Sequence, residues 1–180
     1  NLPKTPLKMS EVEEDFWKLM GPVFKKETIT QEIEFTKEIE PDLPYVLGNK
    51  IELGQVLSNF LNNSLHAVRN APMKNIKLKI YLKDNDWIRW EFSDTGYGIR
   101  LDIIKDIWLP HVTTKGSVEG SGLGLFIIRK IIESHQGRVW AESGGEGKDS
   151  TMIVELPVFT GNPNDYVVKE EPRTKPKSLF

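Results

Sequence analysis

The sequence predicts an α/β two-layer sandwich, in which a mixed and mainly antiparallel sheet is covered on one face by three helices. Three segments repeat apolar residues at helical spacing, and five shorter segments between and after them alternate apolar and polar residues as strands do. Two of these strands are joined by a turn of a few residues, so they form an antiparallel hairpin. A hydrophobic fraction of 38% with 28% charged residues is typical of one globular core.

The first helix is expected to begin at Ser10 and to end near Lys26. Residues 1–9 contain two prolines and no apolar period, so we interpret them as a linker from an upstream domain, and residues 10–160 as the folded unit. Ser10 is a typical N-cap, and acidic residues after it suit the positive end of a helix. The residues expected to face inward are Val12, Phe16, Leu19, Met20 and Val23. A strand is then expected over residues 28–40, where Ile29, Ile33, Phe35 and Ile39 alternate.

A long amphipathic helix is predicted from Lys50 to Val68. Its apolar stripe is Leu53, Val56, Leu57, Phe60, Leu61, Leu65 and Val68, with Ser64 filling one gap. Its polar face is rich in amides and poor in charge: Glu52, Gln55, Asn59, Asn62, Asn63, His66 and, just beyond the helix, Asn70.

Apolar and polar residues alternate over residues 77–83 and 87–92, and the Asp-Asn-Asp cluster between them is typical of a turn. These two segments are therefore expected to form the hairpin. The second strand leads into an irregular, glycine-rich stretch over residues 94–122, with a short helical piece at 102–107.

The C-terminal part is expected to contain one helix and two strands. The helix covers residues 122–137 and is expected to stop at Gly137 in the left-handed conformation. Strands follow at 138–143 and 150–157, and residues 161–180 have prolines and charge without a period, which indicates an extended or disordered tail.

Composition excludes several classes of function. A formal net charge of -2 gives no basic field for a phosphate backbone, so we expect no nucleic-acid partner. The absence of cysteine removes disulfides and thiolate metal sites, and no apolar run is long enough to cross a bilayer. We therefore expect a cytoplasmic chain without direct membrane contact, cut from a longer protein whose anchor, if it has one, lies elsewhere.

Two glycine motifs point to a nucleotide. Residues 94–99 read DTGYGI and residues 120–125 read GSGLGL; neither ends in Gly-Lys-Ser/Thr, and neither opens a dinucleotide-binding unit. Gly96 and Gly98 allow the backbone to approach a flat base closely. Gly120, Gly122 and Gly124 lie where a helix begins, so free amide groups and the positive helix end would face a triphosphate.

Polar side chains complete the expected site. Asp94 can accept a hydrogen bond from the exocyclic amine of adenine, and it would repel the carbonyl that guanine presents there. Asn59 and Asn63 are four residues apart and share a helix face, with His66 three further on. A carboxamide oxygen is a suitable neutral ligand for Mg²⁺, which takes negative charge from the phosphates. Isolated asparagines could equally be surface residues, and His66 could be a neutral donor to a backbone carbonyl.

These motifs resemble those of sensor histidine kinases. Residues 55–68 resemble the N box, 94–99 the first glycine box, WLPHVTTK (108–115) the F box and 120–125 the second glycine box, in the order of that family. The resemblance implies the Bergerat ATP-binding fold, with ATP between the amide-lined helix and a lid. It makes Asn63 the Mg²⁺ ligand and Asn59 a phosphate contact.

The resemblance implies further roles. Gly96 and Gly98 would be the base platform, and Thr151 would support Asp94 through its hydroxyl. Lys115 would act on the phosphates with Asn59, under a mobile lid formed by residues 116–121. The remaining ATP contacts that it implies are His66, Ile99, Thr114, Gly120, Ser121, Gly122, Leu123, Gly124 and Leu125.

The F box departs from the family pattern. Trp108 keeps an aromatic plug, but Leu109 stands where a carboxylate is usual, so lid closure or docking is expected to differ in detail. His135 lies at a helix end, where a cation suits the dipole, and we interpret it as a cap. None of the histidines has the context of a phosphoacceptor, so the acceptor is expected on a separate helical domain, with a response regulator downstream.

Three alternatives use the same fold. DNA gyrase, the related heat-shock chaperone and mismatch-repair ATPases hydrolyse ATP with a glutamate four residues before the Mg²⁺ asparagine, and here that position is Asn59, which has no useful basicity. The sequence does not exclude the other two functions, which are a serine kinase of the anti-sigma-factor type and a non-catalytic ATP-dependent interaction module. Histidine kinase activity is the interpretation that the motifs favour.

Overall fold

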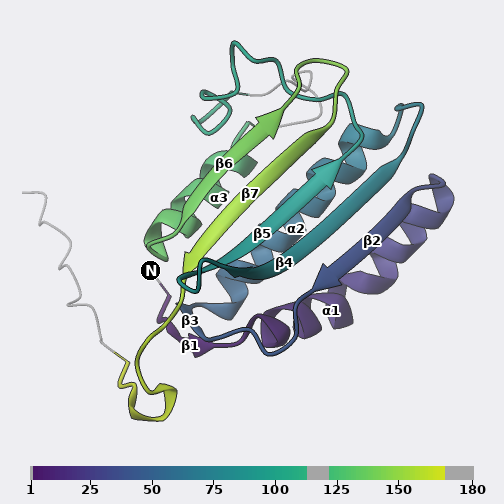
Figure 1. The fold of residues 1–180 in the computed structure, drawn as a ribbon. Helices are drawn as coiled ribbons and strands as arrows, with labels where there is room; N and C mark the ends of the chain where they lie inside the picture. Colours follow the sequence, from purple (N-terminus) through teal and green to yellow (C-terminus); the bar gives the residue numbers. More distant parts are fainter. Residues whose placement is uncertain (1, 113–121, 169–180) are drawn as a thin grey trace, which may run out of the picture.

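The computed structural model describes residues 2–112 and 122–168 (Figure 1). Its elements in chain order are β1 (Thr5–Leu7), α1 (Met9–Thr30), β2 (Glu34–Ile39), β3 (Val46–Gly48), α2 (Lys50–Val68), β4 (Asn75–Lys83), β5 (Trp87–Asp94), α3 (Gly124–Ser134), β6 (Arg138–Ser143), β7 (Ser150–Pro157) and a 3-10 turn (Pro163–Asp165).

The main sheet has the order β2-β4-β5-β7-β6, and α1, α2 and α3 lie together behind it (Figure 1). Strands β2 and β4 pair in parallel, and the other three pairs are antiparallel. The predicted mixed, mainly antiparallel sandwich is therefore confirmed. A second, two-stranded sheet joins β1 to β3.

Helix α2 is the centre of the core, and its predicted bounds are confirmed. Every residue of the predicted apolar stripe is buried, including Ser64 at 2% exposure. Phe60 packs against Phe92 of β5 with ring centroids 4.8 Å apart. Burial of one such side chain contributes about 1.5 to 3 kcal/mol, so this interface holds α2 firmly against the strands that carry the site.

The predicted hairpin is also confirmed. Strands β4 and β5 pair from Ile76 opposite Asp94 to Lys83 opposite Trp87. The turn residues Asp84 and Asn85 both have positive φ, as a tight hairpin turn requires.

The start of the chain differs from the prediction. Residues 5–7 form β1 within the expected linker, and α1 begins at Met9, with the Glu11 carboxylate accepting a hydrogen bond from the Lys8 N–H. The helix also continues to Thr30, into the expected strand. Ile29 and Ile33 are four residues apart, a spacing that fits a helix as well as a strand.

Two residues of the expected inward stripe of α1 lie outside. Leu19 is 76% exposed and Val23 is 57% exposed, whereas Val12, Phe16 and Phe24 are buried. Helix α1 lies at the edge of the helical layer, where it packs against α2 (Figure 1). Its buried stripe is therefore narrower than the sequence pattern suggests.

The end of α3 uses a different residue for the left-handed position. Gln136 has φ 58°, its N–H donates to the Glu133 carbonyl, and the Gly137 N–H donates to the Ile132 carbonyl. This is a Schellman motif with Gln136, not Gly137, in the left-handed region. Gly137 is still required, because a Cβ there would lie 2.5 Å from the carbonyl oxygen of Glu155.

His135 is the C-cap of α3, as expected, but it is buried and neutral, so the cationic charge assigned to it is wrong. Its Nε2 accepts a hydrogen bond from the Asn49 N–H at 3.0 Å, so its Nδ1 carries the proton and donates to the Ile131 carbonyl at 2.7 Å. Burial lowers the pKa of His135. The imidazole thus joins the end of α3 to the start of α2, where Asn49 is the N-cap.

Two smaller segments also differ from expectation. Residues 102–107 form consecutive turns and no α-helix. In the expected tail, the 3-10 turn is followed by Tyr166, whose ring packs edge-on against Phe159 with centroids 5.7 Å apart. Within the described ranges, none of the helices is long and apolar enough to span a bilayer.

Candidate nucleotide-binding site

Four parts of the fold meet at one end of the sheet (Figure 1). They are the end of β5 with residues 95–99, the turn between β6 and β7, the C-terminal half of α2 and the start of α3. The Gly147 N–H donates to the Tyr97 carbonyl at 2.7 Å, and the Ile99 N–H donates to the Ser143 hydroxyl at 3.1 Å. The first glycine motif is therefore fixed to the β6–β7 turn.

Asp94 is the buried anion of this region, with 6% of its surface exposed. Its Oδ1 accepts a hydrogen bond from the Gly96 N–H at 3.0 Å, and its Oδ2 accepts one from the Ser64 hydroxyl at 3.2 Å. The Ser150 hydroxyl lies 3.3 Å from both oxygens. Side chains and backbone from α2, β7 and the glycine loop thus hold one carboxylate.

Burial raises the pKa of Asp94 to about 6, and the charge of Asp149 acts in the same direction. The hydrogen bonds from Gly96, Ser64 and Ser150 oppose this shift because they stabilise the anion. Asp94 is consequently ionised at neutral pH. A buried carboxylate of this kind is a strong acceptor for an amine and unfavourable for a carbonyl oxygen.

The expected support of Asp94 by Thr151 is wrong. The Thr151 hydroxyl bonds to the Ser93 hydroxyl at 2.9 Å, and both residues lie on the face of the sheet away from the helices. Neighbouring strand residues point to opposite faces, so the inward hydroxyl of β7 is that of Ser150, directly opposite Asp94.

The two glycines of the first motif are required by contacts within the protein. A Cβ on Gly96 would lie 2.6 Å from the Ala67 Cβ of α2. Gly98 has φ +67°, and a Cβ there would lie 2.2 Å from the Gly145 carbonyl oxygen. Packing against α2 and the β6–β7 turn therefore explains these glycines, and their contact with a base stays a prediction.

Asn59, Asn63 and His66 are partly buried on α2, and Asn59 lies beside the start of α3. The Asn59 Nδ2 donates to the Gln55 carbonyl at 2.9 Å, which leaves its Oδ1 turned toward Gly124: a Cβ on that glycine would lie 3.6 Å from Oδ1. The structure thus brings the amide face of α2 beside the first residue of α3, as the sequence predicted.

Gly124 is the first residue of α3, and Leu123 is its N-cap. The first amides of a helix have no partner within it, so those at 124–126 are available to an anion. Leu125 is partly buried against the core and orients this turn.

Gly122 packs against His111. It has φ +66°, its carbonyl accepts the His111 N–H at 3.0 Å, and a Cβ on it would lie 2.7 Å from the His111 carbonyl carbon. Trp108 is buried as the expected aromatic plug, and Leu109 is 46% exposed. Four predicted site residues, Thr114, Lys115, Gly120 and Ser121, lie outside the described residues, as does the expected lid at 116–121.

The donor set suits Mg²⁺-ATP. No group of three or more His, Cys, Asp or Glu side chains in the described ranges could hold a metal ion. Asparagine oxygens beside helix amides match a cation that keeps most of its waters and takes its charge from phosphates. Asn63 would be the protein ligand, and the amides at the start of α3 would hold the phosphates.

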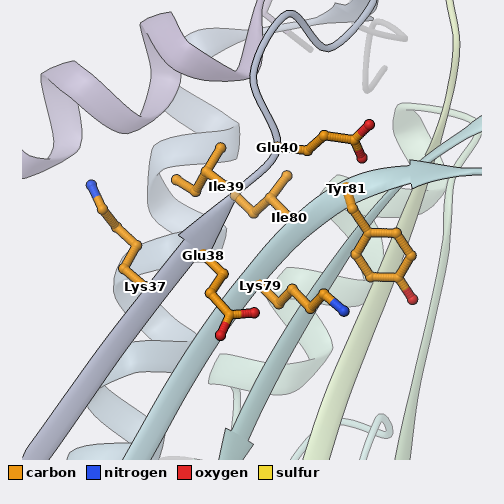
Figure 2. A pocket seen from close by; sticks show the side chains of 7 residues that line it. All are labelled: Lys37, Glu38, Ile39, Glu40, Lys79, Ile80 and Tyr81. Carbon is orange, nitrogen blue, oxygen red and sulfur yellow. The ribbon is translucent and has the colours of Figure 1, made fainter.

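A hollow elsewhere on the molecule is unrelated to this site. It lies between the ends of β2 and β4 and is lined by Lys37, Glu38, Ile39, Glu40, Lys79, Ile80 and Tyr81 (Figure 2). The Lys79 ammonium lies 4.7 Å from the centroid of the Tyr81 ring, and the Glu40 carboxylate accepts the Leu82 N–H at 2.9 Å. None of its lining residues is among the predicted nucleotide contacts.

Sequence reasoning missed Ser64 and Ser150 as partners of Asp94. The sequence contained a signal for each. Ser64 is the one polar residue in the apolar stripe of α2, and Ser150 lies an even number of residues from Val154 and Leu156, so it shares their face of β7. A buried hydroxyl in an apolar stripe needs a polar partner, and the only carboxylate expected nearby was Asp94.

Comparisons with known proteins agree with this geometry. Residues 48–160 match the family described as "Histidine kinase-, DNA gyrase B-, and HSP90-like ATPase". The chain is 35% identical over 132 residues to the sensor protein FixL of Bradyrhizobium diazoefficiens, covering 73% of this chain and 26% of that protein. It is 33% identical over 156 residues to the adaptive-response sensory kinase SasA of Prochlorococcus marinus, covering 84% and 38%. The chain thus spans well under half the length of these relatives.

Solved structures give the same result. The catalytic domain of histidine kinase ThkA superposes with a TM-score of 0.70 at 28% identity, covering 87% of this chain and 97% of that one. Full-length ShkA in complex with AMPPNP has a TM-score of 0.71 at 23% identity, covering 91% and 33%, and supports the fold alone. The chain therefore belongs to the histidine kinase-, DNA gyrase B- and HSP90-like ATPase family, and it has the Bergerat fold of a sensor histidine kinase catalytic domain.

Proposed function

We propose that this chain binds Mg²⁺-ATP at the end of β5 and donates the γ-phosphate to a histidine on a separate helical phosphoacceptor domain. The observation that carries the proposal is the buried Asp94 carboxylate, held by donors from α2, β7 and the glycine loop, where α2 also places Asn59 beside the start of α3. Adenine would donate its exocyclic amine to Asp94, and the phosphates would lie between α2 and α3.

The amide of Asn59 supports transfer over hydrolysis. Its nitrogen is occupied by the Gln55 carbonyl, and its oxygen lies beside Gly124 at the start of α3. An amide oxygen can orient a phosphate or its hydration shell, but it cannot remove a proton from water. The base for phosphoryl transfer would be the acceptor histidine, so catalysis would depend on positioning and on neutralisation of charge.

The metal ion, the phosphates and the signalling partner belong to the same proposal. Asn63 would hold Mg²⁺ through its side-chain oxygen, and Lys115 would approach the phosphates. The phosphorylated histidine would pass its phosphate to a response regulator in two-component signalling. We propose a cytoplasmic location, where ATP is available.

Binding without turnover is the direct test. The chain on its own should bind Mg²⁺-ATP in calorimetry and release almost no phosphate, because it has an amide where a hydrolytic enzyme of this fold has a carboxylate. Steady phosphate release by the chain alone would favour an ATPase instead. Absence of nucleotide binding would reject the site itself.

A further inference from the structure

Ser64 stands out among the residues that surround Asp94. It is the one polar residue among the buried side chains of α2, at 2% exposure, and its hydroxyl donates to Asp94 Oδ2 at 3.2 Å. A hydroxyl buried among apolar side chains is unfavourable unless it is hydrogen-bonded, so its presence here depends on the carboxylate.

The other donors are placed differently. The Gly96 N–H is directed at Oδ1, 3.0 Å away. The Ser150 hydroxyl is 3.3 Å from both oxygens, and it has a single hydrogen to share between them. Ser64 is therefore the one donor among these three that is committed to Oδ2. Without it, Oδ2 would keep only the Ser150 hydroxyl, which is equally close to Oδ1.

Ser64 also adjoins Asn63 in the sequence. The residue proposed to hold Mg²⁺ and the residue that holds Asp94 are thus consecutive on a helix fixed by core packing. A rigid helix that contacts both ends of the nucleotide site would set the distance between base and metal.

We propose that Ser64 is a positioning residue for adenine selection, whose hydroxyl fixes the rotation of the Asp94 carboxylate so that it meets the exocyclic amine of the base. This inference rests on the proposed function, in which Asp94 binds adenine. It adds a specificity determinant on α2, separate from the strand that carries Ser150.

The test compares two nucleotides that differ only in the exocyclic amine. Affinities of Mg²⁺-ADP and of purine riboside diphosphate, which lacks that amine, are measured by calorimetry for the wild type and for Ser64→Ala. We expect the wild type to prefer ADP by at least about tenfold, as for a hydrogen bond to a charged group, and Ser64→Ala to lose most of that preference. Its affinity for purine riboside diphosphate should stay within about twofold of the wild type, because a positioning role concerns the amine contact alone.

Two further variants sharpen the result. Ser64→Cys keeps the shape with a weaker donor and should be intermediate, and it supplies the test if the alanine variant does not fold. Ser93→Ala removes a hydroxyl adjacent to Asp94 in the chain but directed to the opposite face, where it bonds to Thr151, and should keep the full preference for ADP.

The possible results distinguish a wrong role for Ser64 from a wrong assignment of Asp94 to the base. If the wild type and Asp94→Asn bind the two nucleotides equally well, Asp94 does not bind the base and the proposed site is wrong. If Asp94→Asn abolishes the preference for ADP while Ser64→Ala and Ser64→Cys retain it, the site stands and the role of Ser64 is rejected.

Discussion

Replacement of Asp94 by asparagine should weaken nucleotide binding and at the same time stabilise the fold. Burial raises the pKa of this carboxyl from 3.8 to about 6. At about 1.4 kcal/mol per pKa unit, this shift corresponds to a cost of about 3 kcal/mol for keeping the ionised form in the folded protein at neutral pH, to order of magnitude. An amide of the same shape removes that cost and can still accept from the Gly96 N–H and donate to the two serine hydroxyls.

The raised pKa of Asp94 determines how its contribution to stability changes with pH. A carboxyl whose folded pKa is raised contributes stability that is fully present below its unfolded pKa, near 3.8, and lost as pH rises through about 6. The advantage of Asp94→Asn in free energy of unfolding should thus be largest above about pH 7 and should disappear near pH 4. ADP affinity should fall about 10- to 150-fold, the equivalent of about 1.5 to 3 kcal/mol for a lost charged hydrogen bond.

Urea denaturation at several pH values and calorimetry with Mg²⁺-ADP measure both quantities on the same two proteins. Titration of other groups, His135 among them, cancels in the difference between wild type and variant. An unchanged ADP affinity would remove Asp94 from the site. A stability difference that does not vary with pH, or a clear loss of stability at neutral pH, would refute the argument from burial.

Asn63→Ala is expected to abolish the Mg²⁺ dependence of nucleotide binding, whereas Asn59→Ala should lower nucleotide affinity and keep that dependence. Calorimetry with and without Mg²⁺ distinguishes the two variants. The reverse pattern would overturn the assignment of Asn63 as the Mg²⁺ ligand. Gly96→Ala should destabilise the fold by about 1 to 3 kcal/mol in urea denaturation, because its Cβ would lie 2.6 Å from a methyl group of α2. Gly54→Ala, where no atom lies within 4 Å of the new Cβ, is the matched control and should be neutral or stabilising. Because burial lowers the pKa of His135, its own contribution to stability should fall as pH drops below about 6.5, the ordinary value for histidine, opposite in sign to that of Asp94. His135→Gln should therefore gain stability relative to the wild type as pH falls, and a difference that does not vary with pH would contradict the neutral, buried imidazole.

The sequence was most informative where one structural period dominated. Helix α2 and the β4–β5 hairpin were predicted closely because their apolar residues admit a single spacing over many residues. The boundary after α1 was not, since Ile29 and Ile33 fit either period and only tertiary packing decides between them. Leu19 and Val23 were assigned to the core because a pattern cannot show that α1 lies at the edge of the helical layer (Figure 1).

The site was predictable in its residue types and less so in its contacts. Asp94 and the amide face of α2 were predicted from side-chain chemistry and residue spacing. The hydroxyl that supports Asp94 could not be predicted, because it depends on which face of β7 points toward the core. That register places Ser150 opposite Asp94 and turns Thr151 away. The sequence predicted that Gly96 and Gly98 make room for a base, which stays a prediction; it did not show that a side chain at these positions would also collide with Ala67 and Gly145.

His135 illustrates a function of packing that no motif predicts. Its ring connects the last turn of α3 to the N-cap of α2, and the Asn49 side chain in turn donates to the Pro3 carbonyl at 2.9 Å. The two helices whose other ends lie at the proposed nucleotide site are thus joined by one hydrogen-bond chain at the far end of the domain. These contacts become visible only once the helices are placed side by side.

The most direct test of the whole account is the chemical identity of the phosphorylated residue. The chain is incubated with Mg²⁺-ATP labelled in the γ-phosphate, alone and with a histidine-bearing helical domain of the sensor-kinase type, fused to it or added in trans. We expect no stable label on this chain alone and, with the helical domain present, an acid-labile and alkali-stable phosphate on that domain, because it brings both nucleophile and base to the γ-phosphate. Hydrolysis at a rate that the helical domain does not change, or acid-stable label on a serine, would contradict the assignment as a histidine kinase.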